Sequence, residues 1–511
     1  MTAPSPVRAS TARGELTFTY DAAGRETARG LAGAATLTQS WDAGHRLVEQ
    51  VIHSGTGAAG PGGDTVLQAR SYAYRGDGHL TSVGDRLGGT RRFDLDRAGR
   101  VTRVSAESWT ETYAYDELGN LTTATYPGTA GQDAQGAVGR SGTRITSAGR
   151  TTYEYDGQGR VVRMIRRTLS GLRRIWTYTW NADDRLTEAS TPDRGVWRYR
   201  YDVFGRRTAK WRVAGDGSAV DKTLFTWDNT QLAEQVSVRD GVADTDTWDW
   251  EPGTHRAVSQ LRTKGDEAGA GTLDRQFYAI VTDLVGTPSE LVTQDGTIAW
   301  RATASLWGSP LAGDDGGLCP LAFPGQYRDP ETGLHYNLAR YYDPDTAHYL
   351  SPDPLGLVPA PNHHAYVDNP FRWSDPLGLE GKSTEPVRIY DDSEYDKHGS
   401  RSGGSAKGEI GRAPTNGQAA LDRSIPLGDP KNPANFRRVG VDHVNNEIVV
   451  LDRTREVLDK EGNVLHELYH GHVQSSYPSD SVKENDLTRM VREGMINNKK
   501  KQKVLPPKCD G

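Results

Sequence analysis

The chain has 511 residues, enough for roughly three domains of ordinary size. Hydrophobic residues make up 35% of it, glycine occupies 58 positions, and tyrosine and tryptophan occupy 22 and 12, a composition that favours turn-rich β structure over helix bundles. A formal charge of −6 excludes an overall basic surface for nucleic acid, and two cysteines exclude a disulfide framework. No apolar run is long enough for a membrane span or for the core of a standard signal peptide.

The composition changes near residue 380. All twelve tryptophans precede that point, whereas five of the thirteen histidines follow it. We therefore place the main domain boundary there. Within the first part we expect a disordered start over residues 1–14, with repeats from residue 15 onward.

The repeats have the pattern aromatic-x-aromatic-Asp-x-x-Gly-Arg and recur at a spacing of about 20 residues or its double. Four clear copies are FTYDAAGR (18–25), YAYDELGN (113–120), YEYDGQGR (153–160) and YRYDVFGR (199–206). Each copy predicts a strand with its aromatic residues on one face, a turn at Asp-x-x-Gly, and a second strand. Because one hairpin cannot bury its aromatic face, consecutive hairpins are expected to pair into a long sheet.

These tandem Tyr-Asp repeats are followed by GQYRDPETGLHYNLARYYDPDTAHYLSPDPLGL at residues 325–357. Together they resemble the RHS (YD) repeat family and its RHS-associated core. The resemblance implies a mainly β fold in which an antiparallel sheet spirals into a shell, complete or partial, with a C-terminal toxin beyond it. It assigns residues 15–300 to the repeats and residues 301–379 to the core.

The core ends in two copies of Asp-Pro-Leu-Gly-Leu, which begin at Asp353 and Asp375. Such a pair is similar to the aspartyl-protease-like self-cleavage site of RHS proteins. The resemblance implies that these two carboxylates cut the chain after Leu379. The chemistry is reasonable, because two carboxylates that share one proton can activate water and protonate the leaving amide. Asp-Pro-x-Gly also forms ordinary turns, which is the structural alternative.

The remaining residues are expected to contain a flexible leader at 380–410 and a small α+β toxin module at 411–511. Glycine and serine are frequent in the leader. The elements predicted for the module are a short helix or turn at 417–424, strands at 436–443, 446–453 and 464–473, and an amphipathic helix at 484–496.

The sequence HELYHGH, residues 466–472, allows two chemistries. On a helix, His466 and His470 share a face and can bind zinc, with Glu467 as the general base. A turn signal directly before this segment and a glycine directly after His470 leave little room for such a helix. A zinc peptidase that uses these three residues is therefore the alternative hypothesis, with zinc as its cofactor.

On a strand, His470 and His472 share a face because side chains alternate. One imidazole could take the proton of an RNA 2′-hydroxyl while the other protonates the leaving oxygen. Arg437, Arg438 and Arg453, from neighbouring strands, are candidates to stabilise the phosphorane charge. This hypothesis needs no metal and no other cofactor, and its substrate is RNA. The tail also resembles toxin modules of RHS and contact-dependent systems, many of which are similar to metal-free ribonucleases.

The leading hypothesis is therefore a polymorphic toxin of interbacterial competition, whose β carrier releases a ribonuclease by self-cleavage. The resemblance implies that the protein is secreted or delivered at the cell surface by an unidentified secretion machinery. It also implies that the toxin acts in the target-cell cytoplasm and that a cognate immunity protein blocks it in the producer. Besides the zinc peptidase, a non-enzymatic adhesion or carbohydrate-binding repeat protein is the remaining alternative.

Overall fold

The structure is a computed structural model of the chain. It describes the following residues: 7–11, 14–31, 34–42, 44–55, 65–127, 132–266, 272–311, 317–357, 362–383, 387–390, 414, 420–421, 424–427, 437–442, 447–458, 464–473 and 490. The contacts divide the chain into two compact units. The first unit covers most of residues 1–384, and the second contains residues 385–511 and two short turn segments at 41–46 and 73–81.

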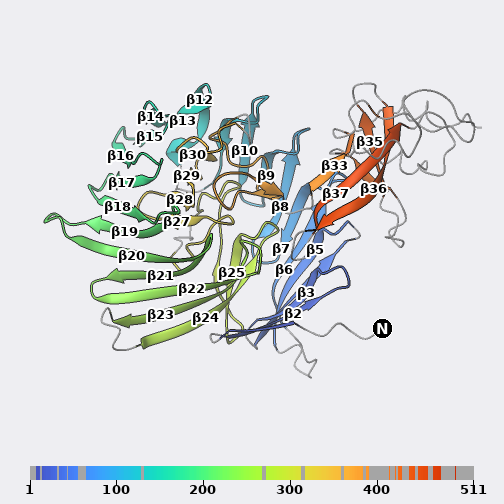
Figure 1. The fold of residues 1–511 in the computed structure, drawn as a ribbon, viewed down its shortest axis with the longest axis horizontal. Helices are drawn as coiled ribbons and strands as arrows, with labels where there is room; N and C mark the ends of the chain where they lie inside the picture. The colour runs from blue at the N-terminus through green and yellow to red at the C-terminus, as the bar shows by residue number, and fades with distance from the viewer. Residues whose placement is uncertain are drawn as a thin grey trace, which may run out of the picture. The chain divides into compact units, whose positions relative to one another are not determined.

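The first unit is built on a 26-stranded sheet, in which strands that follow one another in sequence pair antiparallel. In Figure 1 these strands follow one another around the unit in chain order, from blue to yellow-green. The first half comprises β1 (Val7–Thr11), β2 (Gly14–Tyr20), β3 (Glu26–Leu31), β4 (Ala35–Trp41), β5 (Leu47–Ser54), β6 (Thr65–Tyr74), β7 (Leu80–Asp85), β8 (Gly89–Leu95), β9 (Val101–Ser105), β10 (Thr110–Tyr115), β11 (Leu121–Thr125), β12 (Gly136–Ser141) and β13 (Arg144–Ala148). The second half comprises β14 (Thr151–Tyr155), β15 (Val161–Arg167), β16 (Arg173–Trp180), β17 (Leu186–Ser190), β18 (Val196–Tyr201), β19 (Arg207–Val213), β20 (Ala219–Asp228), β21 (Gln231–Arg239), β22 (Val242–Trp250), β23 (Ala257–Asp266), β24 (Thr272–Thr282), β25 (Pro288–Thr293) and β26 (Ile298–Arg301).

The repeats form the predicted hairpins, and the structure gives each consensus position a physical role. In the copy at 153–160, Asp156 Oδ1 accepts the backbone N–H groups of Gln158 and Arg160, each at 3.0 Å, and Oδ2 accepts Arg160 Nε at 2.7 Å. Gly159 has a φ of 87°, which a residue with a side chain rarely adopts. Arg160 Nη1 then donates to the carbonyl oxygen of Asn181, the first residue of the next turn, at 2.8 Å. The arginine therefore joins one turn to the next.

The two aromatic positions of each repeat differ in their tasks. The first aromatic residue, such as Tyr153, is buried in the core of the unit. The second one lies at the end of its strand and donates from its polar end to the main chain of the preceding hairpin. Examples are Tyr155 Oη to Ile145 O at 2.9 Å and Trp227 Nε1 to Arg207 O at 2.7 Å. This explains why tyrosine and tryptophan recur at the second position, since both combine an apolar ring with a donor.

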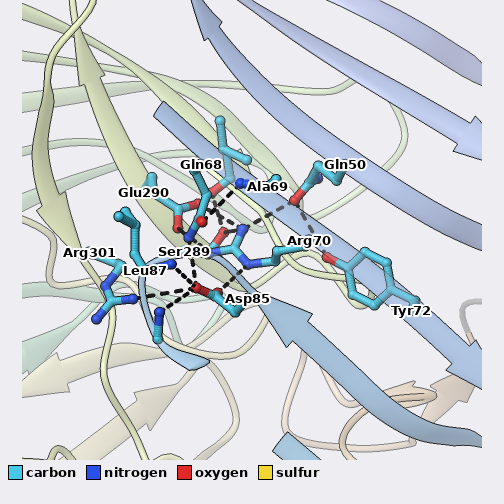
Figure 2. A network of polar contacts seen from close by, with 12 residues as sticks. Gln50, Gln68, Ala69, Arg70, Tyr72, Asp85, Leu87, Ser289, Glu290 and Arg301 are labelled. Atoms are coloured by element: carbon cyan, nitrogen blue, oxygen red, sulfur yellow. Dashed lines mark hydrogen bonds and ion pairs between the residues drawn. The ribbon is translucent and has the colours of Figure 1, made fainter. Parts of the chain in front are cut away.

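The first strands of the sheet pack against its last strands. Leu16, Leu31 and Ile52 share a hydrophobic cluster with Phe277 and Val292. The first and last strands also share a buried polar seam, defined here as Gln50, Gln68, Arg70, Asp85 and Glu290. Arg70 Nη1 donates to Glu290 Oε2 at 2.9 Å, and Arg70 Nε donates to Asp85 Oδ2 at 2.9 Å (Figure 2). The sheet therefore curls so that its first strands pack against its last strands, as expected for a partial shell.

The core segment adds four short strands that form their own sheet: β27 (Tyr327–Asp329), β28 (Leu334–Asn337), β29 (Arg340–Asp343) and β30 (His348–Tyr349). Their aromatic side chains pack against those of the repeats, for example Tyr341 with Tyr199. A pair of two-residue strands follows, β31 (Trp373–Ser374) and β32 (Lys382–Ser383). A short 3₁₀ helix, η1 (Gln132–Ala134), precedes β12.

The second unit contains a five-stranded sheet of order β33-β37-β36-β35-β34. Its strands are β33 (Val387–Tyr390), β34 (Ile425–Leu427), β35 (Arg437–Asp442), β36 (Glu447–Leu458) and β37 (Val464–Val473). The three strands predicted for the module are thus confirmed. Ala420 and Leu421 are helical and pack on the sheet, and Met490 is helical and buried. The rest of the helix predicted at 484–496 lies outside the described residues.

Two segments that were expected to be disordered or flexible contain strands. The start at 1–14 contains β1, because the edge of β2 offers unpaired main-chain groups with which residues 7–11 pair. The leader at 380–410 contains β32 and β33. The alternation of Val387 and Ile389 with polar residues suits a strand, and β33 pairs in parallel with β37. Residues 391–410 of the leader lie outside the described residues.

Candidate functional site

The strongest candidate site lies in the core segment, where Asp353 and Asp375 both contact Arg340. Both side chains are at most 4% exposed. Arg340 lies between them: its Nη2 is 2.8 Å from Asp353 Oδ2 and 3.3 Å from Asp375 Oδ2. The two carboxylates therefore also share one guanidinium, a cation that the prediction from the sequence did not include. This arrangement keeps two buried acids close without leaving two uncompensated charges.

The guanidinium of Arg340 also contacts the chain at the expected point of cleavage. Its Nε donates to the carbonyl oxygen of Gly378 at 2.5 Å, and its Nη2 donates to the carbonyl oxygen of Leu379 at 3.4 Å. Its planar face lies 3.7 Å from the ring centroid of Tyr349. Arg340 thus places a positive charge at both carboxylates and at the carbonyl of Leu379.

Asp375 is held at both of its oxygens. Oδ1 accepts the backbone N–H of Leu379 at 2.8 Å, and Oδ2 accepts Tyr349 Oη at 2.7 Å. Its own carbonyl oxygen accepts Asn337 Nδ2 at 2.8 Å. The carboxylate is therefore fixed beside the backbone of Leu379 by donors from β28 and β30.

Asp353 has a different environment. Its Oδ1 accepts the backbone N–H of Leu355 at 2.8 Å, and its own N–H donates to the carbonyl oxygen of His363 at 2.8 Å. Burial raises the pKa of Asp353, although Arg340 partly opposes this effect. The two carboxylates therefore differ, since Asp375 receives a phenol hydrogen bond and no described tyrosine donates to Asp353.

The Asp-Pro-Leu-Gly sequence explains the local fold at Asp375. Gly378 has a φ of 66°, and a Cβ at this position would overlap the carbonyl oxygen of Asn337. Only glycine allows the chain to turn so close to β28. The N–H of Ala339 donates to the carbonyl oxygen of Leu377 at 3.1 Å, which holds the turn against the sheet.

The turns of the repeats also form hydrogen bonds with the core segment. His364 Nε2 lies 3.1 Å from the carbonyl oxygen of Gly159, and Asn369 Nδ2 donates to that of Gly99 at 2.7 Å. Arg185 Nη1 donates to the carbonyl oxygen of Leu338 at 2.8 Å. The turns of the repeats therefore bind the core segment and hold it in place.

Sequence reasoning identified Asp353, Asp375 and Leu379 but missed Arg340, Tyr349 and Asn337. All three lie in the stretch at residues 325–357 that carries the resemblance. They were overlooked because the many aromatic residues of this stretch predict strands and give no sign of a polar site. The available signal was the single arginine in LHYNLARYYD, a stretch rich in apolar and aromatic residues, because a buried cation needs a buried anion.

The second candidate site lies in the sheet of the second unit. The strand register pairs Arg437 with Asp452 and Asp452 with His470, while Val450 is paired with His472. Because paired residues lie in one row, Arg437, Asp452 and His470 form a row across three strands. Arg437 Nε donates to Asp452 Oδ1, and Arg437 is 41% exposed. The side chains of His466, Glu467, His470 and His472 lie outside the described residues.

The other two predicted arginines are separated from this row. Arg438 pairs with Leu451 and Arg453 pairs with Tyr469, in rows that belong to the buried cluster of the unit. Arg438 is buried and donates to Ser424 Oγ and Ser424 O, each at 2.6 Å. Of the three candidates, Arg437 alone shares a row with a predicted catalytic histidine.

The helical arrangement required by the zinc alternative is not found, because His466, Glu467 and His470 belong to strand β37. The strand predicted for this stretch is confirmed, and β36 and β37 pair as a hairpin from Leu458 and Val464 onward. The turn itself, at residues 459–463, lies outside the described residues. Within the described part of the chain, no helix has the length and hydrophobicity that crossing a bilayer would require.

Comparisons with known proteins agree with the repeats and the core. The family model described as RHS protein matches residues 278–311, and that described as RHS Repeat matches residues 96–130 and 180–219. The protein named "probable deoxyribonuclease RhsA" of Dickeya dadantii is 34% identical over 375 residues, which are 71% of this chain and 24% of that protein. The protein named "double-stranded DNA deaminase toxin A" of Burkholderia cenocepacia is 33% identical over 333 residues, 61% of this chain and 22% of that protein.

The fold has a counterpart among solved structures. The crystal structure of TcdB2-TccC3-TEV matches with a TM-score of 0.53 and 19% sequence identity. The match covers 72% of this chain and 20% of the chain in that structure. The chain spans about a quarter of the length of the curated relatives named above. The repeated hairpins, the core segment and these matches agree, and the chain belongs to the RHS repeat family.

Proposed function

We propose that the chain is a toxin carrier of the RHS family that cuts itself between Leu379 and Glu380 and so separates its C-terminal module. The observation that supports this proposal is the cluster of Asp353, Arg340 and Asp375 around the backbone of Leu379. Two buried carboxylates and a cation at the carbonyl oxygen can supply the general base, the general acid and the charge stabilisation that promote hydrolysis of an amide.

The reaction consumes one water molecule. One carboxylate takes a proton from the water, whose oxygen attacks the carbonyl carbon of Leu379. Arg340 stabilises the negative charge that develops on the carbonyl oxygen. The other carboxyl group donates its proton to the nitrogen of Glu380, the C–N bond breaks, and the products are a carboxylate at Leu379 and an amine at Glu380.

The test is the fate of the full chain. The wild type should yield fragments whose intact masses correspond to residues 1–379 and 380–511, whereas Asp353→Asn and Asp375→Asn should each remain uncut. A matched control is Asp202→Asn, which changes a carboxylate in a repeat turn and should leave cleavage unchanged. A wild-type chain that stays intact, or an Asp375→Asn chain that is cut at Leu379, would contradict the proposal.

We further propose that the separated module is a metal-free nuclease delivered to competing bacteria, with RNA as its substrate. His470 and His472 would be the general acid and base, and Arg437 would bind the phosphate. The support is the register, which aligns Arg437 with His470 across β35, β36 and β37. The two curated relatives are named for different reactions on DNA, so the family likeness alone does not select the reaction or the nucleic acid. A cognate immunity protein would protect the producer by blocking this site.

The test is controlled expression of the full chain in bacteria, with growth, RNA integrity, DNA integrity and bound zinc measured together. The wild type should be toxic, should cause loss of RNA and should contain no stoichiometric zinc. Toxicity and loss of RNA should both disappear in His472→Ala and in Arg437→Met. Arg453→Met is the matched control and should stay toxic, because its row differs. Loss of toxicity only in Glu467→Ala, with zinc bound, would favour the peptidase instead. A chain that is neither toxic nor cut would favour the adhesion alternative.

A further inference from the structure

A hydrogen-bonded chain of three buried residues ends at Asp375. Asn337 Nδ2 donates to Tyr349 Oη at 2.8 Å, and Tyr349 Oη donates to Asp375 Oδ2 at 2.7 Å. Asn337 is fully buried and Tyr349 is 1% exposed. These residues come from β28 and β30, while Asp375 lies in the second Asp-Pro-Leu-Gly-Leu copy. Asp353 has no comparable phenol among its described contacts.

The amide of Asn337 fixes the direction of this chain. Its Nδ2 donates both to Tyr349 Oη and to the carbonyl oxygen of Asp375, each at 2.8 Å. In the flipped orientation, the amide oxygen would face the carbonyl oxygen of Asp375, which is also an acceptor. Because the phenol oxygen accepts from Asn337, its own proton is directed at Asp375. Tyr349 is therefore a donor to the carboxylate.

Tyr349 stays a donor over the whole working range of pH. Burial and the negative charge of Asp375 raise the pKa of its phenol well above the ordinary value, and Arg340 only partly opposes this. The other titratable groups near Asp375 are Arg340, Asp353 and Tyr366, and burial also raises the pKa of the Tyr366 phenol. A phenol proton directed at a carboxylate favours the charged form of that carboxylate.

We propose that Tyr349, oriented by Asn337, is a positioning residue that holds Asp375 as the charged base and leaves Asp353 as the acid. This inference rests on the proposed self-cleavage. Asp375 takes the proton from the attacking water with the free lone pair of Oδ1, whose other partner is the N–H of Leu379. Asp353 delivers its proton to the nitrogen of Glu380 as the peptide bond breaks. Solvent then returns one proton from Asp375 to Asp353, and both groups are ready in their original states.

The first experiment is a pH profile of self-cleavage. Full-length protein is purified in denaturant, diluted into refolding buffers of different pH, and followed by the appearance of the 1–379 fragment. In Tyr349→Phe the ring that stacks on Arg340 remains, and only the hydroxyl is lost. Since the charged carboxylate loses a donor, the acidic limb of the profile should move by about one pH unit toward higher pH, a loss of roughly tenfold on that limb. Asn337→Asp, which loses the donor Nδ2, should move the limb in the same direction.

The matched control is Tyr342→Phe. This hydroxyl is equally buried and donates to the carbonyl oxygen of Trp307 at 2.9 Å, away from both carboxylates. Its removal should leave the profile in place. An equal displacement in Tyr342→Phe and Tyr349→Phe, or none in Tyr349→Phe, would overturn the inference.

A second readout separates this inference from the proposed cleavage. In chains labelled with ¹³C-carboxyl aspartate and blocked by Asp353→Asn, the titration of Asp375 can be followed by NMR and assigned with Asp375→Asn. Adding Tyr349→Phe should move this titration to higher pH by about one unit. If the wild type is never cut, the proposed function fails, yet the NMR titration still decides the role of Tyr349. An unmoved titration overturns that role even if the wild type is cut.

Discussion

The buried polar seam that joins the two ends of the sheet supplies the sharpest stability prediction. Glu290 is fully buried and accepts two hydrogen bonds from Arg70 and one from Gln68 Nε2 at 3.3 Å. Glu290→Gln keeps the shape of the side chain but removes its charge. Arg70 then has Asp85 as its remaining acidic partner (Figure 2). Removing one member of a buried ion pair costs about 3 to 5 kcal/mol. We expect a value near the lower end, about 3 kcal/mol, because Asp85 stays in place.

Chemical denaturation followed by tryptophan fluorescence measures this cost. Adding Arg70→Met to Glu290→Gln should recover most of the loss, because replacing both members of a buried pair is often neutral. Asp85 then still accepts Gln68 Nε2 and the backbone N–H of Leu87. The single and double variants together form a double-mutant cycle.

The same substitution in an exposed pair is the control. Glu188 is 34% exposed and lies 3.0 Å from Arg198, which is 52% exposed. Glu188→Gln should cost no more than about 1 kcal/mol. A cost below about 1 kcal/mol for Glu290→Gln, or purely additive effects of the Arg70 and Glu290 changes, would refute the reasoning that this seam holds the first strands of the sheet against its last strands.

Three further predictions concern other parts of the first unit. Burial and the adjacent Asp345 raise the pKa of Asp343 to about 6, so the folded state keeps a proton that the unfolded state releases near pH 4. The free energy of unfolding should therefore fall as the pH rises from 4 to 6, and Asp343→Asn should flatten that slope in pH-dependent denaturation curves. Trp227→Phe should lower the free energy of unfolding by about 1 kcal/mol in urea titrations, since it leaves the carbonyl oxygen of the preceding hairpin unpaired. Gly378→Ala should abolish self-cleavage in the intact-mass assay, because its Cβ would overlap the carbonyl oxygen of Asn337, whereas Gly215→Ala, in open space, should not.

Local patterns predicted the repeats and three strands of the second unit, because each signal lies within one hairpin. Asp353 and Asp375 were found for a similar reason, as two copies of one five-residue motif. Arg340 escaped notice because its importance depends on a distance between side chains that only the folded core segment defines.

The buried polar seam could not be predicted from the sequence either, because its residues are far apart in the chain. Arg70 and Glu290 are 220 positions apart, and either residue alone reads as an exposed charge. Only the curl of the sheet brings them together and buries them. The helix that the zinc alternative requires is not found for a local reason, because His466 and His470 share a face on a helix, whereas this stretch forms strand β37.

The arginine that joins one repeat turn to the next has an evolutionary consequence. Arg100, Arg160 and Arg206 each donate to a main-chain carbonyl oxygen, those of Asp116, Asn181 and Asn229. A carbonyl oxygen is present whatever side chain the next turn carries, so a repeat does not need to match the identity of its neighbour. Whole repeats can therefore be duplicated, lost or exchanged by recombination while the bonds between turns survive. Sheets with different numbers of repeats can arise in this way, because the same bond forms at each junction between turns.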